Sequence, residues 1–317
     1  MRTIFNLFKR SPQDVGGSTA NQDLPVRRYT VEFRDMLQTV FGAQAFFGDF
    51  FAGGLEALEG IQNNDEAFRV KTSDIPVVVG VYNTDSDVAF GTGTGNSSRF
   101  GPRTEIIYVD TPVPYTHVWA FDEGIDNFTV NNLPAAAVAD RLELQARAKT
   151  NLFNTWHGAF IANSAGNTQA LANYSPESVL ELFNMLAAYY VNIQAMGTKV
   201  AKVVPALYNA LVDHPLTVVE KRGEANISSN TIVRFKDFII EAIPDQVLTV
   251  SGTQYAAYTY ITGIGKAFTG INTVRTIMPE GFDGVALQGA GKAGEFMIDD
   301  NKKAVVRVTA PVAAPAP

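Results

Sequence analysis

The sequence predicts an α+β protein with a two-stranded β-projection that extends from its core. Two runs rich in β-branched and aromatic residues, Ile75–Tyr82 and Thr104–Asp110, flank the glycine- and serine-rich segment Gly91–Ser98. Such runs favour strands, and the connection between them is longer than the usual loop of about two to six residues. A long helical pattern begins at Pro134, and short strand-like runs follow it to the C-terminus. Because an isolated hairpin is marginal in water, we expect this one to lie on another surface, most simply another copy of the chain.

Composition narrows the class of protein. The chain has 317 residues, is 46% hydrophobic and can bury a large core, which we expect to form two or more lobes. No apolar run approaches the roughly 18 to 20 residues needed to cross a bilayer, and residues 1–10 lack the features of a secretory signal. We therefore expect synthesis in a cytoplasm and no membrane contact. The absence of cysteine excludes disulfides, thiol catalysis and thiolate metal sites, and the net charge of −7 argues against a dedicated nucleic-acid binder.

The N-terminal part of the chain is predicted to be an arm. Residues 1–25 have the composition of a flexible linker. From Val31 to Phe51 apolar residues recur with a helical period, with interruptions at Gly42 and Gly48. The aromatic face would be an exposed patch unless it is covered, so we expect four residues to contact other subunits: Phe46, Phe47, Phe50 and Phe51. A core helix within the same chain is the alternative.

Helix signals dominate the middle of the chain. After the turn-rich segment Asp122–Pro134, a helix is predicted from Pro134 to about Ala162, roughly 40 Å long. A second helix is marked by Ser175 as N-cap, Pro176 at its first position and Gly197 as its stop.

Shorter elements complete the predicted order. Residues 199–205 are predicted to form a strand, residues 206–212 a short helix and residues 231–243 another strand. Closing strands are predicted at 284–288, 295–299 and 303–309, covered by the long helix. The Ala/Pro composition of residues 310–317 is typical of a mobile tail.

No catalytic constellation is found. His117, His157 and His214 have no acid or nucleophile at a motif spacing, and we expect them to be structural. The segment Gly263–Gly270 departs from a phosphate loop, because Tyr260 and Ala267 occupy positions that the motif gives to Gly and Ser or Thr. The glycines of Gly91–Ser98 lack a following helix. Acidic pairs such as Glu123 with Asp126, or Asp299 with Asp300, fit turns in which carboxylates cap backbone amides. We predict no catalytic, cofactor-binding or metal-binding residues.

The order of these parts resembles the major capsid proteins of tailed bacteriophages, which have the Hong Kong 97 type fold. The resemblance covers the chain from about Val26 to Thr309. It lies mainly in Pro279–Gln288, which leads into Asp299–Val308, and in Asp122–Gly124 before the long helix.

This resemblance implies a division of the chain into named parts. They are a flexible N-terminal segment at 1–25, an N-terminal arm at 26–72, an extended β-hairpin loop at 73–121, a peripheral domain with a spine helix at 122–172, an axial domain at 173–278, closing strands of the peripheral domain at 279–309 and the tail at 310–317. The axial domain would gather at the five- and six-fold positions of an icosahedral shell.

The resemblance also implies partners and a location. The chain would form pentamers and hexamers in a virion shell that encloses double-stranded DNA without sequence recognition, after synthesis in the cytoplasm of a bacterial host. Only about 25 residues precede the arm, so the shell would use a separate scaffolding protein, or none. A portal and decoration proteins are the further partners that the resemblance implies. Some family members cross-link a hairpin lysine to a neighbour's asparagine. Here no lysine lies between Lys71 and Lys149, so we expect a non-covalent shell.

Three other interpretations stay open at this point. An encapsulin-like nanocompartment would share the fold and would copurify with cargo enzyme. A phage tail or head-decoration protein would form trimeric or tubular particles. A hydrolase-type enzyme would be active as a stable monomer.

Overall fold

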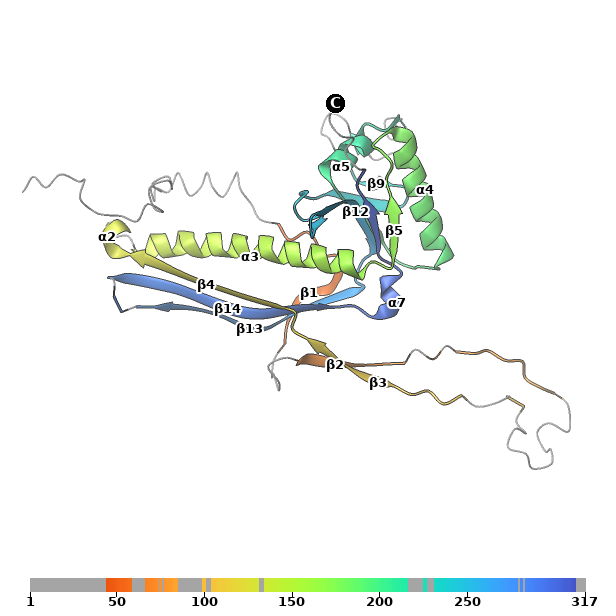
Figure 1. Cartoon of the computed structure of the whole chain (residues 1–317), viewed down its shortest axis with the longest axis horizontal. Coiled ribbons are helices and arrows are strands. Elements are labelled where there is room, and N and C mark those ends of the chain that lie inside the picture. The colour runs from red at the N-terminus through yellow and green to blue at the C-terminus, as the bar shows by residue number, and fades with distance from the viewer. Residues whose placement is uncertain are drawn as a thin grey trace, which may run out of the picture.

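Two sheet-containing lobes and a projecting hairpin make up the protein (Figure 1). In the computed structural model a long helix lies along one sheet, the second lobe stands at one end of that helix, and the hairpin extends away from the body. The structure describes the following residues: 44–58, 66–73, 75, 77–84, 99–100, 104–130, 134–215, 225–226, 231–278, 280–281 and 283–311.

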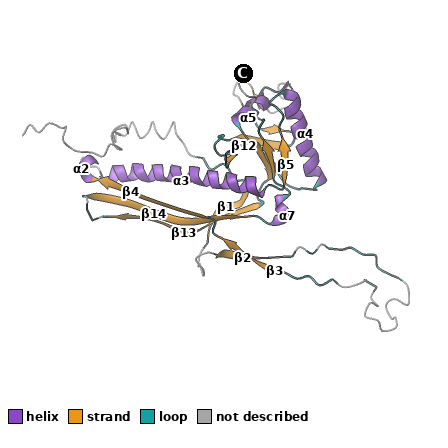
Figure 2. Ribbon diagram, in the orientation of Figure 1, coloured by secondary structure: helices purple, strands orange, loops and turns teal. Residues whose placement is uncertain are grey.

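The first lobe is a four-stranded sheet covered by the long helix α3, Pro134–Ser164 (Figure 2). Its strand order is β1-β13-β14-β4. The parallel pair joins β1 to β13, whereas the β13–β14 and β14–β4 pairs are antiparallel. The strands are β1 (Phe51–Ala57), β4 (His117–Asp126), β13 (Gly265–Ile277) and β14 (Gly284–Phe296).

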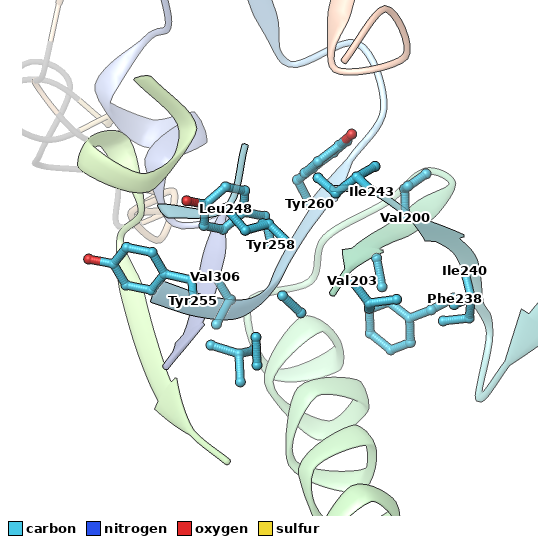
Figure 3. Close-up of a cluster of buried hydrophobic side chains, with 14 of the residues drawn as sticks. Val200, Val203, Phe238, Ile240, Ile243, Leu248, Tyr255, Tyr258, Tyr260 and Val306 are labelled. Atoms are coloured by element: carbon cyan, nitrogen blue, oxygen red, sulfur yellow. The ribbon is translucent and has the colours of Figure 1, made fainter. Parts of the chain in front are cut away.

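The second lobe contains a seven-stranded sheet in which the path β5-β15-β12-β6-β10-β9 is extended by β11, which pairs with β12. Helix α4 (Pro176–Asn192) buries one face against this lobe, and Phe183 contacts Phe235 and Phe238 at ring distances of 5.1 and 5.6 Å. Figure 3 shows part of this core, including Tyr258, Tyr260 and Val306. Its other elements are β5 (Asn167–Ala170), β6 (Lys199–Val203), α5 (Pro205–Val212), β9 (Arg234–Phe235), β10 (Phe238–Ala242), β11 (Thr249–Val250), β12 (Thr253–Ile261) and β15 (Val306–Thr309).

Four smaller features complete the described structure. The projecting hairpin is formed by β2 (Glu66–Thr72) and β3 (Val109–Pro114). A short pair joins β7 (Ala225–Asn226) to β8 (Thr231–Ile232). Single-turn helices lie at α2 (Asn127–Val130) and α7 (Asp299–Lys302). No helix in the described part of the chain has the length and apolar character that a membrane span requires.

Helix predictions after residue 130 are confirmed. The long helix ends two residues beyond the predicted Ala162. Ser175 is the N-cap of α4, and its hydroxyl accepts a hydrogen bond from the backbone N–H of Ser178 at 3.4 Å. The predicted strand at 199 and the short helix after it are β6 and α5. The end of α4 differs from the prediction, because the helix stops at Asn192 and the chain turns at Gln194, whose φ is 53°, before Gly197 is reached.

One predicted strand and one segment predicted to be turn-rich have different limits in the structure. Residues 231–243 do not form one strand, because Lys236 and Asp237 have φ values of 49° and 72° and reverse the chain between β9 and β10. The segment predicted to be turn-rich, Asp122–Pro134, begins instead inside β4, where residues up to Asp126 pair with β14. Pairing with a long neighbouring strand overrides the local turn preference of Asp and Gly.

The strands are also divided between the two sheets differently from the predicted division into peripheral and axial domains. The last strand of the predicted axial range, β13, pairs in the four-stranded sheet. The predicted closing strand at 303–309 is shortened to β15, which lies between β5 and β12 in the seven-stranded sheet. The predicted strands at 284–288 and 295–299 are joined into β14, which ends at Phe296. These pairings connect residues distant in sequence, which local patterns do not specify.

The predicted helical stripe of the arm is wrong over its described part. Residues 1–43 lie outside the described residues. Beyond them, residues 48–50 form a turn and β1 begins at Phe51. Phe51 pairs with Gly265, where an added Cβ would lie 2.4 Å from the Phe50 ring. The rings of Phe50 and Phe51 lie against the bare backbone of Gly265, and this close approach favours a strand at Phe51 over a helix. Tertiary packing therefore decides the local structure.

Candidate assembly surface

The base of the hairpin is anchored to the body on one face. Phe68 of β2 packs against Phe268 and Phe296, with ring centroids 5.1 and 5.9 Å apart. Arg69 points to the opposite, solvent-exposed face, where Nε donates a 3.1 Å hydrogen bond to Glu66. Apolar and charged residues therefore alternate in β2, as expected of a strand that covers a core with one face.

Beyond this base the hairpin leaves the body (Figure 1). The paired strands are β2 and β3, so the strand pairing predicted for Ile75–Tyr82 and Thr104–Asp110 is displaced toward the base. Within the described residues, 77–84 and 104–108 belong to no strand, and the segment Gly91–Ser98 lies outside the description. Exposed fractions reach 84% at Val77, 81% at Val78, 91% at Val79 and 94% at Val81. This is a large apolar surface without cover from its own chain.

The four aromatic residues expected to contact other subunits do not form such a surface. Phe47, Phe50 and Phe51 are buried in the core of their own chain. Phe46 is half-buried, and its backbone N–H donates a 3.1 Å hydrogen bond to Asn154 of α3. The expectation was wrong because these rings fill the junction of the two lobes: Phe50 contacts Tyr260 at 4.9 Å, and Phe51 contacts His157 at 4.6 Å.

A groove of about 420 Å³ runs between α3 and β4. Trp119 forms part of its wall, and the ammonium group of Lys149 lies 4.2 Å from the centre of the Trp119 ring. Desolvation lowers the pKa of Lys149. At the rim Arg141 binds Glu123, with Nε 2.6 Å from Oε2, and this hydrogen bond lowers the pKa of Glu123. The remaining wall is mainly apolar and includes Phe121, Leu144, Ala148 and Leu152.

Two of the three histidines meet at one buried carboxylate. His117 Nε2 and His157 Nδ1 lie 3.0 and 2.9 Å from the two carboxylate oxygens of Glu295, and the Thr116 hydroxyl donates to Oε2 at 3.3 Å. Burial raises the pKa of Glu295, but the hydrogen bonds from His117 and His157 outweigh it and hold the pKa at about 2. Sequence reasoning missed this contact because 138 residues separate Glu295 from His157.

The cluster joins the long helix to two strands of the sheet. The His117 ring stacks on Trp156 at 4.4 Å, so the histidines are held between aromatic rings and the carboxylate. His214 is separate and buried, with Nε2 3.0 Å from the backbone oxygen of Pro176. All three histidines therefore take part in packing and hydrogen bonding, as expected of structural residues.

Other charged groups also serve the fold. Buried Lys202 binds Glu241 and lies 3.3 Å from Asp49, which accepts a 3.0 Å hydrogen bond from Tyr260. Asp126 accepts a hydrogen bond from the N–H of Phe128 at 2.9 Å, the capping role expected for this acid. Glu123 instead lies in β4 and pairs with α3.

The acidic pair at 299–300 and the glycine segment at 263–270 take part in regular secondary structure. Asp299 and Asp300 begin α7 and pair with Lys302 and Lys303. The segment from Gly263 turns directly into β13, a strand and not a helix that could cradle phosphate. Among the described residues, no cluster of three or more His, Asp or Glu side chains is arranged to hold a metal ion.

Comparison with solved structures places this architecture in a known fold. The chain is similar to the capsid of cyanophage P-SCSP1u, with a TM-score of 0.65, 10% identity, and coverage of 86% of this chain and 89% of that one. Similar values relate it to Mycobacterium phage Che8 (TM-score 0.63, 12% identity, 84% and 92% covered) and to the mature capsid of bacteriophage PhiM1 (0.62, 12%, 87% and 89%). The chain has the Hong Kong 97 type capsid fold.

Sequence comparisons alone do not reveal this relationship. No family model matches the chain, and no curated protein matches it. The Hong Kong 97 type fold is therefore shared with these capsids at an identity of only 10 to 12%. The predicted fold class is confirmed, whereas the pairing of strands required the structure.

Proposed function

We propose that the chain is the major capsid protein of a tailed bacteriophage, which self-assembles as pentamers and hexamers into an icosahedral shell around double-stranded DNA. The observation that carries this proposal is the hairpin, whose apolar residues lie outside the core of a chain with a capsid fold. Burial of apolar area stabilises an assembly by about 25 cal/mol per Å² before the cost of association. Many such contacts add up in a closed shell.

Contacts of this shell are non-covalent in our proposal. Beyond Lys71 in β2 no lysine occurs before Lys149, so the distal part of the hairpin offers no lysine for an amide cross-link to a neighbour. The net charge of −7 fits a container that holds DNA without strong binding to phosphate. The proposed location is the virion, after synthesis in the bacterial cytoplasm, and the proposed further partners are a scaffolding protein, a portal and decoration proteins.

Deletion of residues 88–102 tests the proposal. These residues connect segments 77–84 and 104–108, whose apolar side chains lie outside the buried core, so the truncated subunit should fold with an unchanged unfolding temperature. Electron microscopy of the purified full-length chain should show closed icosahedral particles, and the truncated chain should show few or none. Normal closed shells from the truncated chain would contradict the assigned role of the hairpin.

The contents of the particles separate the capsid from the nanocompartment that would have the same fold. Full-length particles produced during infection should contain nuclease-protected DNA. A cargo enzyme that copurifies in stoichiometric amount, without DNA, would favour the encapsulin-like alternative.

A further inference from the structure

The distal hairpin differs from its base in the pattern of its side chains. In β2, Phe68 and Val70 alternate with charged Arg69 and Lys71. Beyond β2 the alternation stops, and apolar residues follow one another in both segments of the hairpin. They are Val77, Val78 and Val79 in the outgoing segment, and Ile106, Ile107 and Tyr108 in the returning one. The change in pattern occurs where the hairpin leaves the body (Figure 1).

Consecutive apolar residues in an extended chain place apolar groups on both faces. Successive side chains of an extended backbone point to opposite sides, so Val78 faces away from Val77 and Val79. Strands with one face in water alternate between apolar and polar residues, whereas strands buried on both faces contain continuous apolar runs. The distal hairpin has the second pattern, although all of these residues are exposed in the single chain.

We infer that in the assembled shell the distal hairpin is enclosed on both faces by other copies of this chain, and does not lie on one neighbour with its outer face in water. This inference rests on the proposed function. It deepens that proposal by stating that other copies cover both faces of the hairpin.

The scarcity of charged residues in the distal hairpin favours copies of the same chain as the molecules that enclose it. Across described residues 77–84 and 104–108, Glu105 is the one charged side chain, so a complementary surface must be largely apolar and uncharged. The chain itself offers a mainly apolar surface in the groove between α3 and β4, which has Phe121 and Leu144 in its wall. Of its charged groups, Glu123 is paired with Arg141, and the ammonium group of Lys149 lies over the Trp119 ring. The described part of the hairpin extends away from the α3 side of the sheet, so it does not cover this groove in its own subunit (Figure 1).

Single cysteines can test both faces, because the natural chain contains none. Val78→Cys and Val79→Cys place a thiol on opposite faces of the outgoing segment, and Ile106→Cys with Ile107→Cys does the same on the returning one. Each variant is labelled with a maleimide in three states: dissociated subunits, purified particles whose only protein is this chain, and urea-denatured chain as the reference for full reactivity. Denatured samples control for differences in intrinsic thiol reactivity.

We expect labelling to slow by roughly tenfold or more on assembly at both members of each pair, since reaction then requires local opening. Protection of one member of each pair only would overturn the enclosure and leave the capsid function standing. If both members of a pair react as fast in particles as they do in dissociated subunits, the enclosure is overturned as well. Failure of the natural chain to form particles at all would instead refute the proposed function.

A second measurement needs no substitution. Hydroxyl-radical footprinting of the natural chain, read by mass spectrometry, compares oxidation of Ile106, Ile107 and Tyr108 in subunits and in particles. Loss of oxidation at all three supports two-sided enclosure. Continued oxidation of Ile107 alone, or of Ile106 and Tyr108 together, shows one face in water and contradicts it.

Discussion

At the scale of single residues, the Glu295 carboxylate is closely held by its neighbours. It is 6% exposed and is bound by His117, His157 and Thr116, which come from β4, α3 and the residue just before β4. A buried charge of this kind is stable only while its partners satisfy it. The cluster therefore ties the long helix to the sheet through one side chain of β14.

Acid should weaken this contact. Because the folded pKa of Glu295, about 2, lies below its ordinary value of 4.5, its contribution to stability is present above pH 4.5 and is lost as the pH falls toward 2. The full contribution is about 3 kcal/mol, from about 1.4 kcal/mol per pKa unit. Urea unfolding of dissociated subunits between pH 6 and pH 2, roughly the range that brackets this titration, should show the loss in the natural chain and not in Glu295→Gln. Asp300→Asn, at an exposed site, is the matched control and should keep the natural pH dependence.

At the scale of elements, two glycines of β14 determine how the aromatic side chains of β4 pack against it. Gly289 pairs with Phe121 and Gly291 with Trp119, and the two rings of β4 stack on each other at 5.7 Å. A Cβ added at Gly291 would lie 2.6 Å from the Trp119 ring, and one at Gly289 would lie 2.2 Å from Phe121. The bare glycine backbone lets aromatic side chains of the neighbouring strand lie flat across it, and these rings form one wall of the groove.

Gly291→Ala should displace Trp119 and destabilise the subunit by about 1 to 3 kcal/mol, the usual cost of overpacking. Gly48→Ala is the matched control: no atom lies within 4 Å of a Cβ added there, so its stability should equal or slightly exceed that of the natural chain. Thermal unfolding of dissociated subunits compares the two. If Gly291→Ala unfolds with the same free energy as Gly48→Ala, the close approach does not constrain the sheet.

At the scale of the whole molecule, apolar residues divide between two tasks. Phe50 is fully buried between the lobes, whereas Phe100 is 82% exposed on the hairpin, where it contacts Tyr82. The first stabilises the subunit in isolation, whereas most of the surface of the second is open to solvent in the single chain. This division follows from the position of each residue in space and not from its type.

Substitution of these two residues should separate folding from assembly. Phe50→Ala should destabilise the isolated subunit by about 3 to 5 kcal/mol, as for other buried phenylalanines. Phe100→Ala should change subunit stability by less than about 0.5 kcal/mol and lower the yield of closed particles. Urea unfolding measures the first effect and analytical ultracentrifugation the second. A subunit stability unaffected by Phe50→Ala would contradict the burial of that ring.

Local chemistry determined a substantial part of this protein from its sequence. The start of α3, the Ser175 cap of α4 and the presence of a hairpin with exposed apolar segments were all predicted, because caps, helical period and β-branched runs act between near neighbours. Tertiary structure alone decided that β15 and β13 join different sheets, that Phe47, Phe50 and Phe51 lie inside the subunit, and that Glu295 meets two histidines. Each of these depends on contacts between segments far apart in the chain. Such contacts form and contribute to stability only when the two lobes fold, so local sequence patterns do not reveal them.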